Sequence, residues 1–122
     1  MTKPEIILKD IPLLNQRLFL KTVKDFFNKL ELSSQPVVEI ACLPKLKMKE
    51  LNKKYRQKNQ FAEALSFPIW ENITFIPNSR TIKPSPKILL GNIFLNDESL
   101  KDRQKVRQLI CHSLQHLLGK HH

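Results

Sequence analysis

The sequence lacks any long hydrophobic segment. No apolar run reaches eighteen residues, and the mean hydropathy is −0.33. A transmembrane helix needs about twenty predominantly apolar residues in a row, so we expect no membrane span. The first residues, MTKPE, also lack the apolar core and cleavage site of a secretory signal. Internal repeats and low-complexity tracts are absent as well, and a length of 122 residues predicts one domain.

Cysteine is scarce, because the chain has only Cys42 and Cys111. Both fall within segments that we expect to be in the core. Isolated cysteines of this kind favour small buried thiols in a reducing compartment. A disulfide and a catalytic thiol remain the alternatives.

Histidine is missing from the first 111 residues, and all four histidines stand in the last eleven. The final twelve residues read CHSLQHLLGKHH. His112 and His116 are four apart, so on a helix they share one face. Gly119 can end that helix in a left-handed turn and bring His122 back toward the pair. Three converging imidazoles predict a site for one divalent transition metal, with zinc the first candidate, and a fourth position open for water or substrate. The alternative is a solvated, frayed end or a tag remnant.

The same spacing is typical of one class of zinc proteases, whose motif is H-E-x-x-H-x-x-G-x-x-H. This chain matches each histidine and the glycine but has Ser113 where that class has its glutamate. The glutamate is the general base of the protease, and serine cannot replace it near neutral pH. Proteolysis by that mechanism is therefore disfavoured, and a zinc hydrolase or metallopeptidase stays only as a minor alternative.

The charge is strongly basic, with 21 lysines and arginines against 11 acidic residues, a formal net charge of +10. Seven basic residues lie between Lys45 and Lys58, with Glu50 the one acid among them. A second basic group precedes the histidines: Lys101, Arg103, Lys105 and Arg107. Clustering of this kind favours a polyanionic partner such as RNA, although a simply solvated basic surface is the alternative.

The pattern of apolar residues alternates between strand and helix. A helix with Leu14, Leu18 and Phe27 on its apolar side is capped by Asp10 or Asn15, and Gly91 inside a strand marks a bulge or a close backbone approach. Asn96 or Asp97 caps the last helix. The expected strands cover 5–9, 37–43, 65–70 and 88–95, and the later helices cover 46–55 and 100–118. The alternation predicts a single domain over 1–122, with a small mixed sheet covered by helices.

Four segments in this order resemble the YbeY family of bacterial and organellar rRNA maturation endoribonucleases. Residues 38–56 are similar to a strand and a helix ending in N-x-x-Y-R, and residues 65–68 read LSFP. Residues 90–93 read LGNI, where the family has L-G-D-I, and residues 112–122 resemble its terminal H-G-x-L-H-L-x-G-Y-D-H. The order and spacing of these segments make the resemblance specific.

The resemblance implies one α+β domain with one metal, usually zinc, held by His112, His116 and His122. It implies that Arg56 is the arginine of the cleft, and that the LSFP strand lines the same cleft. The implied activity is single-strand-specific, metal-dependent endoribonuclease cleavage in ribosomal RNA 3′-end maturation and ribosome quality control. The implied partners are ribosomal RNA, the small subunit and its proteins, and a ribosome-assembly GTPase, in the bacterial cytoplasm or its organellar equivalent.

The residues themselves add roles within such a nuclease. Arg56 offers a planar fork for two phosphate oxygens and is the candidate catalytic residue. Lys53, Lys54 and Lys58 are candidate substrate-binding residues that hold phosphates without reading sequence, and Ser66 joins them from the LSFP strand. The alternative is that the arginine and lysines are simply solvated residues on a basic helix.

Aromatic residues near this region suit either of two roles. Phe61, Phe67 and Trp70 fall close enough in sequence to stack on single-stranded bases. We favour the alternative, in which they are core residues. Glu63 is the nearest carboxylate to the motif and a weak candidate for a general base.

The chain departs from the family pattern at Asn92, Ser113 and His121. Together these departures are expected to leave the metal ligands intact but to remove acidic and polar groups around them. Groups that orient ligands matter for metal sites, since their loss commonly costs about 10–100-fold in affinity or activity. A catalytically weakened, rRNA-binding assembly factor of the same family is therefore the second functional hypothesis.

Overall fold

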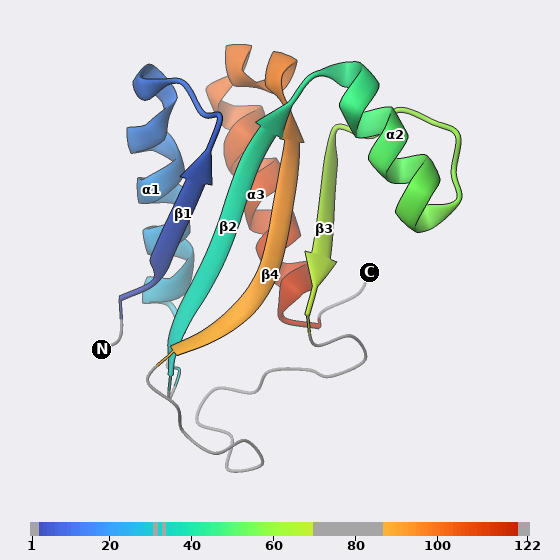
Figure 1. Cartoon of the computed structure of the whole chain (residues 1–122). Helices are drawn as coiled ribbons and strands as arrows, with labels where there is room; N and C mark the ends of the chain where they lie inside the picture. Colours follow the sequence, from blue (N-terminus) through green and yellow to red (C-terminus); the bar gives the residue numbers. More distant parts are fainter. Residues whose placement is uncertain (1–2, 31, 33, 70–86, 120–122) are drawn as a thin grey trace.

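The computed structural model describes residues 3–30, 32, 34–69 and 87–119. Figure 1 shows a four-stranded sheet in the order β1-β2-β4-β3. Three strands run parallel, namely β1 (Glu5–Lys9), β2 (Gln35–Leu43) and β4 (Lys87–Asn96), and β3 (Ala64–Pro68) is antiparallel to β4. The mixed sheet is as predicted. The class is α/β and not α+β, because helices connect the parallel strands of one sheet.

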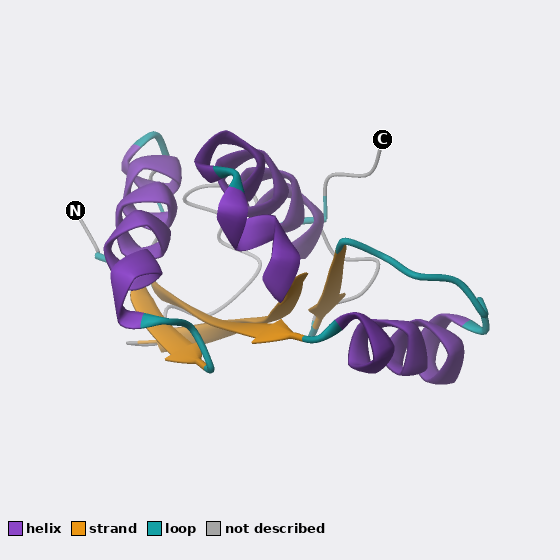
Figure 2. Ribbon diagram, turned by 90° about the horizontal axis from the view of Figure 1, so that it is seen from above, coloured by secondary structure: helices purple, strands orange, loops and turns teal. Residues whose placement is uncertain are grey.

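Two helices cover one face of the sheet. Figure 2 shows α1 (Leu13–Asn28) and α3 (Arg103–Leu117) on that face, while α2 (Lys45–Arg56) lies beside β3 at the end of the sheet. The core fills the space between this face and the two helices. Its fully buried members include Phe19, Val23, Val38, Ile40, Ile93, Leu95, Val106, Ile110 and Leu114. The central strand β2 is buried along most of its length, which matches its compact apolar run in the sequence.

The predicted start of the first helix is wrong. Neither Asp10 nor Asn15 caps it, because α1 begins at Leu13 after Pro12 and has no side-chain cap. Pro12 suits this position, since its fixed φ precedes a helix well. Leu14, which we placed on the apolar side, is 92% exposed. Leu13 is also exposed, so neither leucine at the start of α1 packs into the core.

The last helix is interrupted where a continuous helix was predicted. Asn96 caps the short 3₁₀ helix η1 (Asp97–Lys101), with its Oδ1 accepting from the Glu98 N–H at 3.3 Å. The α3 helix then starts at Arg103, where the Asp102 side chain accepts from the Lys105 N–H at 3.2 Å. The extended backbone of Asp102 separates the two helices. Asp102 is thus the residue at which η1 ends, and its side chain caps the start of α3.

The prediction for Gly91 is confirmed on both counts. The register between β2 and β4 shifts after Val37, so that Leu90 is the extra residue of a bulge. A Cβ at Gly91 would lie 2.4 Å from the Phe67 carbonyl oxygen and 2.8 Å from a methyl of Leu117, and φ is +151°. The missing side chain therefore lets β3, β4 and the end of α3 meet.

Both cysteines are free thiols, as favoured by their isolation. Cys42 is buried and Cys111 is half-buried. Burial, with smaller contributions from Asp97 and Asp10, raises the pKa of the Cys42 thiol to about 11. Burial also raises the pKa of Cys111. A thiol held neutral at pH 7 is a poor nucleophile, so neither cysteine has the character of a catalytic thiolate.

No helix in the described part of the chain is both long enough and apolar enough to cross a membrane.

Candidate functional site

The α3 helix presents two of the three histidines singled out by their spacing. His112 and His116 lie in its last two turns, four residues apart, with His112 exposed and His116 half-buried. Leu114, between the two histidines in the sequence, and Leu117, directly after the second, are fully buried. The core therefore fixes the orientation of this part of the helix. Ser113, which stands where the proteases have glutamate, is buried at 3% exposure. It is therefore poorly placed to act on a substrate.

The third predicted ligand, His122, lies outside the described residues, and so does His121. Within residues 3–30, 32, 34–69 and 87–119, no three or more histidine, cysteine, aspartate or glutamate side chains come together as a metal site. The described chain thus supplies a pair of candidate ligands on one helix. The three-histidine site remains a prediction.

The LSFP strand touches this histidine pair directly. Ser66 Oγ lies 2.5 Å from Nδ1 of His116, a short hydrogen bond between residues fifty positions apart. Ser66 pairs with Ile93 of β4, whose side chain is in the core, so both residues face α3. Ser66 is only 7% exposed. Because this contact engages Nδ1, a metal bound by His116 would take Nε2.

Arg56 reaches the same serine from the other side. Its Nη2 donates to the Ser66 carbonyl oxygen at 2.8 Å, and its guanidinium carbon lies 5.6 Å from the centre of the Phe67 ring. Tyr55 and Phe94 each pack edge-on against Phe67, at centroid distances of 5.5 Å and 5.8 Å. This aromatic row ties the end of α2 to the outer face of β3 and β4. The candidate catalytic arginine and a candidate metal ligand therefore meet at one residue of β3.

The α2 helix leaves its basic residues in solvent. Only Met48 and Asn52 of this helix are buried, and the candidate substrate-binding residues Lys53, Lys54 and Lys58 are exposed. The loop that follows the helix is held to it, because Asn52 Nδ2 donates to the Gln60 carbonyl at 2.9 Å. The result is a basic surface fixed in place next to Arg56.

Phe61, Phe67 and Trp70 were considered either as platforms for stacking bases or as core residues. Phe61 is 39% exposed, with the Lys45 ammonium 5.2 Å from its ring centre, so our expectation of a core position is wrong for this residue. The loop carries it away from the sheet, beside α2. Phe67 is half-buried in the aromatic row, and Trp70 lies outside the described residues. Glu63, the candidate base, forms an ion pair with Lys105 that joins the start of β3 to α3.

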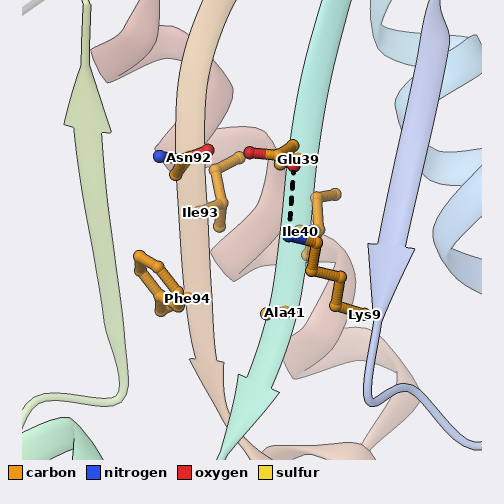
Figure 3. A pocket seen from close by; sticks show the side chains of 7 residues that line it. All are labelled: Lys9, Glu39, Ile40, Ala41, Asn92, Ile93 and Phe94. Carbon is orange, nitrogen blue, oxygen red and sulfur yellow. Dashed lines mark ion pairs between the residues drawn. The ribbon is translucent and has the colours of Figure 1, made fainter.

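Asn92 does not lie beside the histidines. It follows Gly91 on β4 and is directly opposite Glu39 of β2, on the face of the sheet away from α3. Figure 3 shows the Asn92 and Glu39 side chains pointing toward each other across a cavity of about 180 Å³, with Lys9 paired to Glu39 at 3.5 Å. Among the described residues, Asn92 Oδ1 is buried without a hydrogen-bond partner.

The expected effect of this departure is therefore wrong. Successive residues of a strand point to opposite faces, and Ile93, not Asn92, faces α3. An asparagine in place of the family aspartate changes the outer face of the sheet and removes no charge from the histidine pair.

Two comparisons with known proteins indicate the family. A family model described as Endoribonuclease YbeY matches residues 9–122. A curated protein named Endoribonuclease YbeY, from Thermodesulfovibrio yellowstonii (strain ATCC 51303 / DSM 11347 / YP87), is 35% identical over 85 residues. That alignment covers 62% of this chain and 47% of the relative, so the chain spans about half the length of the curated protein it matches.

Proposed function

This chain belongs to the YbeY family, and from that premise we propose that it is a metal-dependent endoribonuclease that cleaves single-stranded RNA. The observation that supports this most is the meeting of Arg56 and His116 at Ser66. A positive, planar group suited to phosphate and an imidazole suited to a metal are thereby held at one strand. We propose ribosomal RNA as the substrate, in 3′-end maturation and in quality control of ribosomes.

The residues present fit a metal of the zinc type. Two imidazoles one helical turn apart are a common pair of ligands, and the Ser66 contact would direct a metal to Nε2 of His116. His112, His116 and, from outside the described residues, His122 would hold the ion. When bound, such a metal supplies a Lewis acid next to the scissile phosphate.

Arg56 would bind and steady the phosphate. A guanidinium has five N–H donors in a rigid fork, and the hydrogen bond to Ser66 uses one of them. The Phe67 ring restricts its movement, so little side-chain freedom is lost when phosphate oxygens are bound. Charge that develops on those oxygens during cleavage is then met by a group already in position.

The exposed lysines of α2 would extend the contact along the RNA. Lys53 and Lys54 lie one turn or less from Arg56, and Lys58 follows it in the loop. Such residues neutralise phosphates without distinguishing bases, which suits a nuclease whose choice of site comes from the single-stranded state of the RNA. We further propose the small ribosomal subunit and its proteins, and a ribosome-assembly GTPase, as partners, on the family relationship alone.

The test compares purified protein with and without metal on structured ribosomal RNA that carries single-stranded ends, and on a generic peptide. Cleavage of the RNA alone, and only with metal, is the expected result. Arg56→Ala should lower the cleavage rate by about 10²–10³-fold with metal content and melting temperature nearly unchanged. Arg56→Lys should restore only part, because lysine lacks the fork. Equal rates for lysine and arginine would contradict the proposed role.

The second candidate is a family member that binds ribosomal RNA but cleaves it poorly. The exposed basic face of α2 favours binding whether or not cleavage follows. Tight, salt-sensitive binding of the same RNA without products in the presence of metal would identify this case.

A further inference from the structure

We propose that Ser66 is the positioning residue of this site, acting on His116 through its hydroxyl and on Arg56 through its carbonyl. This inference rests on the proposed function, since it takes His116 as a metal ligand and Arg56 as the phosphate-binding group. Ser66 itself was predicted to bind substrate. Its burial and its two contacts indicate instead that it holds the groups that do so.

The hydroxyl acts on His116 by occupying one of the two ring nitrogens. A neutral imidazole coordinates through whichever nitrogen lacks a proton, and the hydrogen bond of the other nitrogen decides which one that is. Ser66 Oγ lies 2.5 Å from Nδ1. A metal held by His116 would therefore be directed to Nε2, and Nδ1–H would donate to the hydroxyl oxygen. Carboxylates and carbonyls usually have this role in metal sites. Here a serine from a neighbouring strand has it.

Burial makes this hydrogen bond hard to replace. Ser66 is 7% exposed and lies between β4 and α3, so water has little access to the imidazole from this side. Removing the hydroxyl therefore takes away the contact at Nδ1 that β3 supplies to the imidazole. The same substitution keeps the backbone carbonyl, so the hydrogen bond from Arg56 remains.

The two contacts can thus be broken separately. Ser66→Ala should lower zinc affinity by about 10–100-fold, measured by competition with a chromophoric chelator. Arg56→Ala should leave zinc affinity unchanged. Ser66→Thr keeps the hydroxyl and suits a strand, so it should recover most of the affinity. None of these measurements requires RNA cleavage.

A spectroscopic measurement reports on the ring directly. Two-bond ¹H–¹⁵N spectra of zinc-loaded protein identify the nitrogen of His116 that carries the metal. We expect Nε2 in the native protein and in Ser66→Thr, and a mixture of Nε2 and Nδ1 in Ser66→Ala. Coordination through Nδ1 in the native protein would overturn the proposal.

Ser99→Ala is the matched control, because Ser99 is also a buried serine, at 6% exposure, but lies in η1 near the opposite end of α3. It should leave zinc affinity unchanged. If Ser66→Ala binds zinc as the native protein does, or if both alanine variants lose affinity equally, the positioning role is wrong. A protein that shows the affinity loss yet cleaves no RNA would retain the positioning role and contradict only the proposed nuclease activity.

Discussion

The two helices that carry the candidate site are held in different ways. The α3 helix buries Val106, Ile110, Ser113, Leu114 and Leu117 against the sheet and α1, and its histidines project from that anchored surface. The α2 helix buries only two residues and lies at the end of the sheet (Figure 2). It also contacts β3 through Arg56 on Ser66 and Tyr55 on Phe67.

The difference corresponds to what each helix has to do. Ligands of a metal must keep their geometry within a fraction of an ångström, so they belong on an element fixed by the core. Lysines that meet a flexible RNA need charge and reach more than a fixed geometry, so a helix with most of its surface in solvent suits them. Substitutions in the two helices should therefore separate stability from RNA binding.

The largest effect should come from the core side of α3. Leu114→Ala removes a fully buried side chain and should lower the free energy of unfolding by about 2–5 kcal/mol. Leu46→Ala in α2 is the matched change, and because Leu46 is 75% exposed it should cost less than about 0.5 kcal/mol. Urea denaturation measures both. Similar losses for the two variants would mean that α2 is anchored as firmly as α3.

An intermediate effect is expected at Asn52, the one buried polar residue of α2. Its side chain is 4% exposed and donates to the Gln60 carbonyl, and its own carbonyl accepts from the Lys58 N–H at 3.2 Å. Asn52→Ala leaves the Gln60 carbonyl without this donor and should cost about 1–3 kcal/mol. It should also increase amide hydrogen exchange in residues 57–63. Unchanged exchange there would show that the loop is held by other contacts.

The smallest change in stability should accompany the clearest change in RNA binding. Replacing Lys53, Lys54 and Lys58 one at a time by glutamine should alter the unfolding free energy by no more than about 0.5 kcal/mol. Each loss of a phosphate contact should reduce the slope of log K against log salt by about 0.7 on single-stranded RNA. Lys24→Gln, an exposed lysine of α1, is the control. An equal change in slope for Lys24 would mean that the RNA recognises net charge and no particular face.

Much of the fold follows from local patterns in the sequence. The first strand lies at Glu5–Lys9 as predicted, and Gly91 marks both a bulge and a close approach. These features depend on neighbours in the chain. The exposure of Leu14 depends on how α1 packs, which its helical spacing does not show. The start of α3 at Asp102 rests on a local cap that our prediction from the sequence missed.

The individual residues of the candidate site were predictable from the sequence, but the contacts between them were not. Spacing alone placed His112 and His116 on one side of a helix, and the family resemblance alone singled out Arg56 and the LSFP strand. The contact between Ser66 and His116 joins residues fifty positions apart and depends on the order of strands in the sheet. The side of the sheet on which Asn92 lies depends on the register of β4, which the bulge shifts.

The hydrogen bond from Arg56 to Ser66 has a consequence for how copies of this chain meet one another. In the described sheet β3 is an end strand, and end strands offer backbone groups to which a strand from another molecule can add. The guanidinium occupies one of those acceptors, and Pro68 in the same strand has no N–H to offer. The arginine that we assign to phosphate therefore also occupies a backbone acceptor through which β3 could pair with a strand of another molecule. Replacing it should free this acceptor, and an Arg56→Ala protein should aggregate at lower concentration than Arg56→Lys.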